Sequence, residues 1–303
     1  MLAIEDLKAG THVAGLAFGP AGDLWIATLN YGNGPSGVIV RRAGGSFERF
    51  SRVESFNRVA VDRSDVAWLT VGAGASGQQP KLVRIDRAGR MHDYPLPEEG
   101  NYEGITIGPD GAPWFVDASA GDIGRMGSGG VITYYGPASG DPTEIASGKD
   151  GNLWFTEPAS DKIGRLTPQG ALAEFRVPTA GARPAGIAAG ADGNMWFCES
   201  AADKIGRITP GGRITEFRVP TANAWPAGIA PGRDDSLWFT ELSAAKIGRI
   251  SKGGSIQEFA APGGGYPGPI AAAPDGSLWV ATNAQRDAAF GLAATPSRLI
   301  HFY

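Results

Sequence analysis

Four side chains in this sequence have the chemical types that catalysis requires. Glu103 and Glu144 are carboxylates that could remove a proton as general bases, and His12 could do the same near neutral pH. Arg58 is a permanent cation that could serve as the electrophilic partner of such a base. These residues are widely separated along the chain, so they form a site only if the fold brings them together.

A second set of side chains is suited to binding. Polar residues lie beside the two glutamates, and two aromatic residues could hold a flat or apolar ligand between them. The alternative is that the polar residues are solvated loop ends and that the aromatic rings pack against the next structural unit. The residues that we assign to ligand binding are Asn57, Arg58, Tyr102, Glu103, Thr143, Trp225 and Tyr266.

A regular repeat of tryptophan predicts the fold that must position these residues. Seven of the eight tryptophans are separated by 43, 46, 40, 42, 42 and 41 residues, and Trp225 alone is out of register. A period of roughly 40–45 residues with strand-type units is typical of a β-propeller with one blade per repeat. We therefore predict an all-β, seven-bladed β-propeller that uses residues 1–303 as a single domain. The core tryptophans are expected to be Trp25, Trp68, Trp114, Trp154, Trp196, Trp238 and Trp279.

The repeat near the middle of the chain shows the strands of one blade most clearly. Asp192 and Gly193 separate its first two strands, and Asp-Gly is a strong signal for a β-hairpin. The first strand is expected at the centre of the ring, because its small side chains fit where seven strands meet around one axis. The four antiparallel strands are expected at 184–188, 195–199, 204–209 and 213–217.

The two ends of the chain are expected to complete one blade together. Residues 297–303 match the third strand of the repeat, and residues 2–7 match the fourth strand. We therefore expect residues 2–7 to form the outer strand of the last blade. This closure pairs strand edges that would otherwise be exposed.

Strand direction places the candidate residues on one face of the ring. Because the strands of a blade alternate in direction, the loops after the second and fourth strands share a face. One position near the start of each first strand is expected to face the channel mouth, and blades 2–4 have polar residues there while the others have small ones. This arrangement resembles a pocket with one polar wall. The residues at this position are Ala14, Asn57, Glu103, Thr143, Ala185, Ala227 and Gly268.

Three loops on the same face are longer than their counterparts. They lie at 31–36, 72–80 and 283–295, in the neighbouring blades 1, 2 and 7. Because these blades are neighbours, we expect the three loops to crowd one sector of the mouth, and propeller ligands usually bind at such loops. The alternative is that loop length has drifted without functional constraint.

A repeated pair of opposite charges is interpreted as structural. In blades 4–6, a glutamate three residues after the blade tryptophan faces a lysine across a tight loop, and recurrence in successive blades favours a scaffold role. The pairs are Glu157 with Lys162, Glu199 with Lys204, and Glu241 with Lys246.

Composition excludes several classes of function. The formal charge of −4 comes without a basic block or stripe, so we expect no nucleic-acid partner. No apolar run reaches the 18 or more residues of a membrane span. Cys198 is the only cysteine, which excludes an internal disulfide and a thiolate metal cluster. The first residues do not resemble a signal peptide, so we expect a cytoplasmic protein, although a signal peptide could have been removed. We also expect a monomer.

The phrase NLWFTE…DKIGRLTPQGALAEFRVPT at 152–179 closely resembles the repeat of the virginiamycin B lyase, or streptogramin lyase, family. It recurs at 194–221 and 236–260 and in weaker form in the other blades, so the resemblance covers the whole chain. The resemblance implies a seven-bladed propeller. It also implies opening of the depsipeptide lactone of streptogramin B antibiotics by elimination, with a magnesium ion.

This sequence departs from the family pattern at the positions that the resemblance assigns to catalysis. Gly268 matches the catalytic histidine, and Ala227 matches a second histidine that contacts substrate. Tyr266 and Asn283 match the carboxylates that hold the metal, and neither can supply a negative charge. We therefore predict no metal site and no cofactor, and we predict that the family reaction by these residues is lost.

Three functions fit these observations. The first is a propeller that binds a small molecule or a peptide at its mouth. The second is a lyase or lactone-cleaving enzyme with a relocated active site built on Glu103, Glu144 or His12. The third is an interaction scaffold that binds a protein on its rim, by analogy of fold. The sequence favours the first and leaves open whether the protein is an enzyme.

Overall fold

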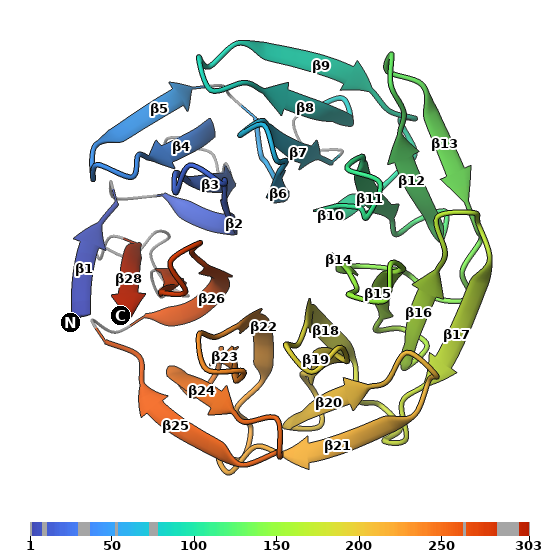
Figure 1. The fold of residues 1–303 in the computed structure, drawn as a ribbon, viewed down its shortest axis with the longest axis vertical. Coiled ribbons are helices and arrows are strands. Elements are labelled where there is room, and N and C mark those ends of the chain that lie inside the picture. The colour runs from blue at the N-terminus through green and yellow to red at the C-terminus, as the bar shows by residue number, and fades with distance from the viewer. Residues whose placement is uncertain are drawn as a thin grey trace, which may run out of the picture.

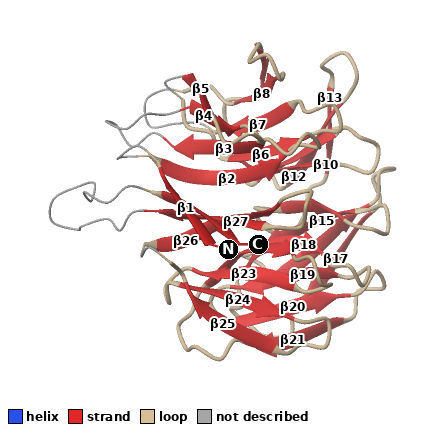
Figure 2. Ribbon diagram, turned by 60° about the vertical axis from the view of Figure 1, so that its left-hand side comes forward, coloured by secondary structure: helices blue, strands red, loops and turns tan. Residues whose placement is uncertain are grey.

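The chain forms a closed ring of seven four-stranded antiparallel sheets around a central axis (Figure 1). The structure is a computed structural model that describes residues 2–7, 11–29, 37–51, 54–72, 78–262, 265–283 and 297–302. The described residues form strands, turns and loops without a helix (Figure 2), and thus no helix that could span a membrane. The predicted seven-bladed β-propeller is confirmed.

Each of the first four blades is built from four consecutive strands, numbered outward from the axis. Blade 1 contains β2 (His12–Phe18), β3 (Leu24–Leu29), β4 (Gly37–Arg41) and β5 (Phe47–Ser51). Blade 2 contains β6 (Arg58–Val61), β7 (Ala67–Val71), β8 (Lys81–Ile85) and β9 (Met91–Pro95). Blade 3 contains β10 (Tyr102–Ile107), β11 (Pro113–Asp117), β12 (Asp122–Met126) and β13 (Ile132–Tyr135). Blade 4 contains β14 (Ile145–Ser147), β15 (Leu153–Glu157), β16 (Lys162–Leu166) and β17 (Leu172–Arg176).

The last blade differs from the others in taking its outer strand from the start of the chain. Blade 5 contains β18 (Pro184–Ala189), β19 (Met195–Glu199), β20 (Lys204–Ile208) and β21 (Ile214–Arg218). Blade 6 contains β22 (Pro226–Pro231), β23 (Leu237–Glu241), β24 (Lys246–Ile250) and β25 (Ile256–Ala260). Blade 7 contains β26 (Tyr266–Ala272), β27 (Leu278–Asn283), β28 (Arg298–Phe302) and β1 (Leu2–Asp6).

Strand β1 closes the ring by pairing with β28. The antiparallel register runs from Leu2 opposite Phe302 to Asp6 opposite Arg298, and the Leu7 amide donates to the Ser297 carbonyl over 2.8 Å. The two ends of the chain lie side by side at this blade (Figure 1). The predicted closure by residues 2–7 is confirmed.

The blade tryptophans lie in the core between sheets. Six of the seven are at most 8% exposed, whereas Trp238 is half-buried. In blade 5 the Trp196 ring stacks on Phe217 of the outer strand at 5.5 Å, and its Nε1 donates to Asp192 of the first hairpin turn over 3.2 Å. The core role that we predict for these residues holds, with Trp238 at the edge of the core.

A glycine on the third strand makes room for a second core ring in blades 3–6. In blade 5, a Cβ placed on Gly206 would lie 2.1 Å from the ring of Phe197, which faces it across the register. That distance is far inside van der Waals contact, so the ring can occupy this place only above a residue without a side chain. The same arrangement holds at Gly124, Gly164 and Gly248.

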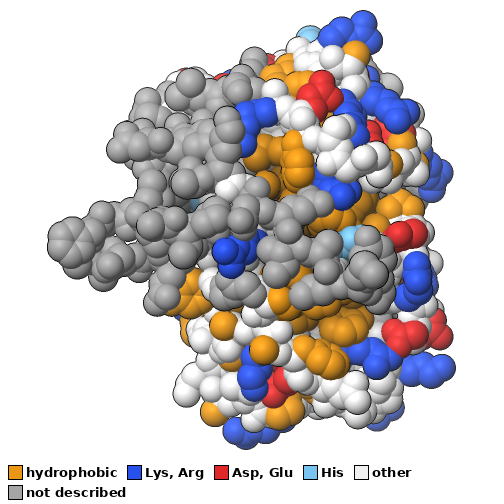
Figure 3. Space-filling model, turned by 90° about the vertical axis from the view of Figure 1, so that its left-hand side faces the viewer, with side chains coloured by type: hydrophobic (Ala, Val, Ile, Leu, Met, Phe, Trp, Pro, Cys, Tyr) orange, Lys and Arg blue, Asp and Glu red, His pale blue; other side chains and the backbone are white. Residues whose placement is uncertain are grey.

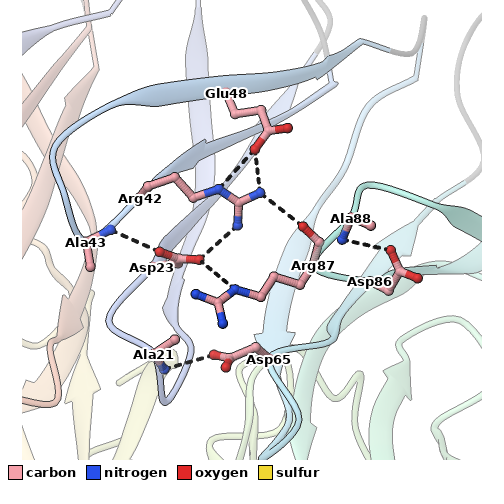
Figure 4. A network of polar contacts seen from close by, with 9 residues as sticks. All are labelled: Ala21, Asp23, Arg42, Ala43, Glu48, Asp65, Asp86, Arg87 and Ala88. Carbon is pink, nitrogen blue, oxygen red and sulfur yellow. Dashed lines mark hydrogen bonds and ion pairs between the residues drawn. The ribbon is translucent and has the colours of Figure 1, made fainter.

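A polar network joins blades 1 and 2 on the face of the first and third hairpin turns (Figure 4). Asp23 is nearly buried and accepts hydrogen bonds from Arg42 at 2.8 Å and from the amide of Ala43 at 2.9 Å. Arg87 of blade 2 lies 3.8 Å from the same carboxylate, and Asp65 of blade 2 accepts from a blade 1 amide. These contacts hold adjacent blades together on the face opposite the candidate residues.

The side of the ring that contains blades 7 and 1 carries both hydrophobic and charged side chains among its described residues. Seen from this side (Figure 3), hydrophobic side chains are interspersed with charged ones. Phe47 on β5 and Phe259 on β25 are among the exposed hydrophobic residues of outer strands. Isolated apolar side chains of this kind are normal on a soluble surface.

Candidate functional site

The candidate acids and Arg58 gather where the inner strands begin. Arg58 is the first residue of β6, Glu103 is the second residue of β10, and Glu144 directly precedes β14. The inner strands surround the axis of the ring (Figure 1), and their first residues share the face of the loops that join one blade to the next. We call this end of the axis the mouth.

Arg58 connects three blades across the mouth. Its Nε donates to Glu144 Oε1 over 2.7 Å, and a terminal nitrogen also pairs with that oxygen. The other terminal nitrogen donates to the carbonyls of Ala14 at 3.1 Å and Asn57 at 2.9 Å. The guanidinium thus links blade 2 to blades 1 and 4, with 35% of the side chain exposed. Burial lowers the pKa of Arg58, but the charges of Glu144 and Glu103 outweigh it and raise that pKa overall.

Glu103 completes a charged group with Arg58 and Glu144. Burial raises the pKa of the Glu103 carboxyl, and the nearby Arg58 charge offsets only part of that effect. Among the described residues, no cation lies within ion-pair distance of Glu103, because Arg58 is directed to Glu144. The group therefore contains two carboxylates and one cation, and one carboxylate has no salt bridge.

Three other predicted binding residues make contacts that hold the mouth together. The Asn57 side chain donates to the Tyr102 carbonyl over 2.8 Å and so ties blade 2 to blade 3. The Tyr102 ring is fully buried and its hydroxyl donates to the Pro97 carbonyl at 3.3 Å. The hydroxyls of Thr143 and Thr156 lie 3.2 Å apart within blade 4. A ligand role for these residues stays a prediction, and in this structure the Tyr102 ring is part of the core.

His12 lies at the junction of blades 7 and 1, whereas the two glutamates lie in blades 3 and 4. Its Nε2 is 3.4 Å from the side-chain nitrogen of Asn283. Asn283 in turn bonds both backbone groups of Val13, accepting from the amide at 2.9 Å and donating to the carbonyl at 3.0 Å. Asn283 is thus an inter-blade clamp, a role that the sequence reasoning missed. The structure brings Glu103 and Glu144 together with Arg58.

Trp225 and Tyr266 are exposed aromatic residues at equivalent positions of neighbouring blades. Their exposed fractions are 39% and 37%; Trp225 directly precedes β22, and Tyr266 is the first residue of β26. Trp225 has a left-handed backbone conformation, with φ of 54°. Its amide donates a hydrogen bond to the Asp203 carboxylate over 3.2 Å, which holds this conformation. The Arg183 guanidinium lies over the indole, 6.0 Å from its centroid. The mouth is therefore polar and charged on blades 2–4 and aromatic on blades 6 and 7.

The repeated glutamate–lysine pairs are opposite in register, but their charges do not pair as the sequence indicates. Glu199 faces Lys204 across the hairpin, yet the lysine Nζ lies 2.7 Å from Glu216 on the outer strand. The same exchange occurs in blades 4 and 6. The glutamates that end the second strands of these blades, Glu157, Glu199 and Glu241, are left fully buried.

The sequence comparison identifies the family. The sequence model of the virginiamycin B lyase family matches residues 3–286. The chain belongs to this family. Its structure is similar to that of a streptogramin B lyase, with 30% identity, a TM-score of 0.85, and 100% of this chain and 98% of that chain covered. A catalytically inactive histidine-to-alanine variant of virginiamycin B lyase from Staphylococcus aureus, solved with quinupristin, matches at 30% identity and a TM-score of 0.85 over 100% of both chains.

More distant matches show the fold alone. One is YCF48 bound to the D1 peptide, at 15% identity and a TM-score of 0.74, with 99% of this chain and 94% of that chain covered. A comparison with curated proteins finds no match.

The magnesium ion that the virginiamycin B lyase family implies does not fit the residues present here. Tyr266 and Asn283 stand at the positions that the resemblance assigns to carboxylates, and both polar atoms of the Asn283 amide are engaged by Val13. In the described part of the chain, no three His, Cys, Asp or Glu side chains are grouped to hold a metal. The long loops at 31–36, 72–80 and 283–295 fall largely outside the described residues.

Proposed function

We propose that this member of the virginiamycin B lyase family binds a small molecule or a peptide at the mouth and does not catalyse the family's elimination. The observation that carries the proposal is the charged group of Arg58, Glu103 and Glu144, drawn from three blades to one end of the ring axis. Residues that meet across blades in this way form a preorganised surface for a ligand.

The charge of this group favours a ligand with a cation or a hydrogen-bond donor. Arg58 is committed to Glu144 by two nitrogen atoms, so the negative charge that remains belongs to Glu103. A carboxylate whose pKa is raised by burial gains most from a positive partner. A ligand ammonium beside Glu103 would restore the charged form of the carboxylate.

The opposite side of the mouth supports an apolar or flat part of the ligand. Ala185, Ala227 and Gly268 are small and partly exposed. A Cβ on Gly268 would lie 3.4 Å from its nearest contact, the side-chain nitrogen of Asn283, so the backbone leaves space there. Trp225 and Tyr266 flank this side with exposed rings that can stack on a ligand.

The binding proposal is tested with three indoles that differ in charge: tryptamine, indole-3-acetamide and indole-3-acetate. We expect tryptamine to bind most tightly in calorimetry or ligand-observed NMR, and E103Q to weaken it about tenfold, or roughly 1.4 kcal/mol. W225A should weaken all three, because it removes the stacking surface. The control is R90A, a charge removed from a well-exposed arginine in an outer hairpin turn. Binding that is unchanged in E103Q, or absent for all three compounds, would contradict the proposal.

A separate assay tests the loss of the family reaction. The purified protein is incubated with quinupristin and magnesium, and ring-opened product is measured by mass spectrometry. We expect no product above background, because Gly268 and Ala227 stand where the resemblance places histidines. Turnover would show that the alignment of blades 6 and 7 is wrong.

A relocated catalytic site is the second candidate, favoured by one observation. The raised pKa of Glu103 brings a carboxylate closer to the range in which it can act as a general base at neutral pH. Activity on a lactone substrate that disappears in E103Q, with the fold intact, would favour this candidate over binding alone.

A further inference from the structure

The last residue of the second strand is a fully buried glutamate in blades 4, 5 and 6. These residues are Glu157, Glu199 and Glu241, each with 0% exposure. Within the described structure, neither carboxylate oxygen of Glu199 or Glu241 has a hydrogen-bond donor. A buried, ionised carboxylate without donors is costly, so such a group binds a proton instead.

The neighbour of Glu199 is a second carboxylate that is fully satisfied. Glu216 accepts from Lys204 Nζ at 2.7 Å and from the amide and hydroxyl of Thr179 at 2.9 and 3.0 Å. Burial raises the pKa of Glu216, but these hydrogen bonds outweigh it and hold that pKa below its usual range. Burial, followed by the Glu216 charge, raises the pKa of Glu199 to about 8, with Asp161 adding to the rise and Lys204 opposing it.

Blade 6 repeats this arrangement. Glu258 accepts from Lys246 Nζ at 3.1 Å and from the amide and hydroxyl of Thr221, both at 2.9 Å. Burial and the Glu258 charge raise the pKa of Glu241 to about 7, with Asp203 adding to the rise and Lys246 opposing it. In blade 4, by contrast, one oxygen of the buried glutamate accepts a hydrogen bond from Ser160 at 3.2 Å.

The threonines connect the buried acids to the mouth. Thr179 lies in the loop 177–183, which leads to β18, and Thr221 lies in the loop 219–225, which ends at Trp225. Each loop is attached to the outer strand of the following blade by the two bonds from its threonine. A change in the charge of Glu199 or Glu241, which lie beside Glu216 and Glu258, therefore acts on a loop that borders the mouth.

In blade 2, a third-strand lysine makes the same contacts as Lys204 and Lys246 without a buried glutamate beside it. We call these contacts the lysine frame. Lys81 binds Asp93 at 3.1 Å and Glu54 at 2.5 Å, as its counterparts bind an outer-strand acid and a loop residue. The second strand of that blade ends at Val71, which is buried and apolar. The glutamates of blades 5 and 6 are thus an addition to a frame that forms without them.

We propose that Glu199 with Glu216, and Glu241 with Glu258, are proton-binding sites that hold the loops 177–183 and 219–225 in place while one proton is shared in each pair. When the proton leaves to a solvent base, two carboxylates face each other in a buried position. The repulsion is relieved when the outer-strand glutamate moves into solvent, and that movement releases the threonine bonds.

The direction of the pH effect follows from linkage. The buried glutamate has a higher pKa in the attached state, where the charge of the outer-strand glutamate lies beside it, than in the released state, where that charge has moved into solvent. Attachment of the loop is therefore strongest at low pH and weakens about tenfold per pH unit between the two pKa values. It is then constant above pH 8 for blade 5 and above pH 7 for blade 6.

The test is amide hydrogen exchange of the full-length protein between pH 6 and pH 9, expressed as protection factors. Protection of the loop 177–183 should fall by up to about 100-fold, and that of the loop 219–225 by up to about tenfold. In E241Q the loop 219–225 should keep its protection at pH 9, because glutamine stays neutral and can still donate to Glu258. The loop 177–183 of E241Q should still respond to pH, and E199Q should show the reverse pattern.

Each loop is the control for the other, and the segment around Lys81 should not respond to pH in any of the proteins. If the buried glutamates were only structural, E199Q and E241Q would change the protection of their loops by the same factor at every pH. Constant protection of both wild-type loops from pH 6 to pH 9 would overturn the proposal. An undiminished pH response of the loop 219–225 in E241Q would also overturn it. The wild-type profile is a test by itself, because both loops must lose protection as the pH rises.

Discussion

Replacement of Asn283 by aspartate changes a single nitrogen atom at the closure of the ring. Asn283 accepts from the Val13 amide and donates to the Val13 carbonyl, at 2.9 and 3.0 Å, and both residues are at most 8% exposed. An ionised aspartate can still accept from the amide. Its second oxygen faces the carbonyl, so a hydrogen bond becomes a repulsion between two buried oxygen atoms.

The cost of this exchange can be worked out from these contacts. A buried carbonyl that loses its donor costs about 1–3 kcal/mol, and a poorly compensated buried charge adds several kcal/mol before the group takes up a proton. We expect a loss of about 3–5 kcal/mol at pH 8. Unfolding entropy of about 2.1 cal/mol/K per residue, over 303 residues, converts this loss to a drop in Tm of roughly 5–8 °C.

The pH dependence separates the charge from the lost contact. Burial should raise the pKa of the new carboxyl, and the protonated form can donate to the Val13 carbonyl as asparagine does. The stability of N283D should therefore approach that of the wild type at pH 5 and fall as the pH rises through the folded-state pKa. Thermal unfolding followed by circular dichroism at pH 5 and pH 8 measures this, with N283A as the uncharged control. A Tm of N283D within 1 °C of the wild type at pH 8, or a loss equal at both pH values, would refute the reasoning.

Two further predictions concern the scaffold. Deletion of the first eight residues removes β1 from β28, so the Tm should fall by more than about 5 °C; an unchanged Tm would contradict the closure. G206A places a Cβ 2.1 Å from the Phe197 ring and should cost about 1–3 kcal/mol, measured by denaturant unfolding. The matched control is G44A, where a Cβ meets nothing within 4 Å; equal stabilities of the two variants would show that the ring yields freely.

The blades could be predicted from the sequence because each repeat contains the local signals that determine its strands and turns. The tryptophan period, the Asp-Gly turn at Gly193 and the small inner strand recur locally, and the first strand of blade 5 is found within one residue of its predicted end. Closure could be predicted because the two chain ends supply the strands that one repeat lacks. Trp238 departs from the pattern in being half-buried. The degree of burial depends on packing between blades, which the repeat alone does not determine.

The charged contacts could be predicted only in part, because side-chain reach does not follow the repeat. Register correctly places Glu199 opposite Lys204, but the lysine extends to Glu216 on the next strand. Arg58 crosses from blade 2 to Glu144, which is 86 residues away, without any recurring pattern that signals the contact. Sequence reasoning could select these acids as candidates, whereas their partners depend on geometry across blades.

Asn283 shows why a family position cannot be assigned a function from alignment alone. The resemblance identifies this position with a metal-binding carboxylate, and the sequence shows only that the charge is missing. The structure gives the asparagine a function that a carboxylate cannot fulfil, because the Val13 carbonyl requires a donor. A carboxylate introduced here would weaken the junction of blades 7 and 1 before it could attract a cation. The position is therefore committed to closing the ring, and the ligand that we propose would have its charged partners on the other side of the mouth, at Arg58, Glu103 and Glu144.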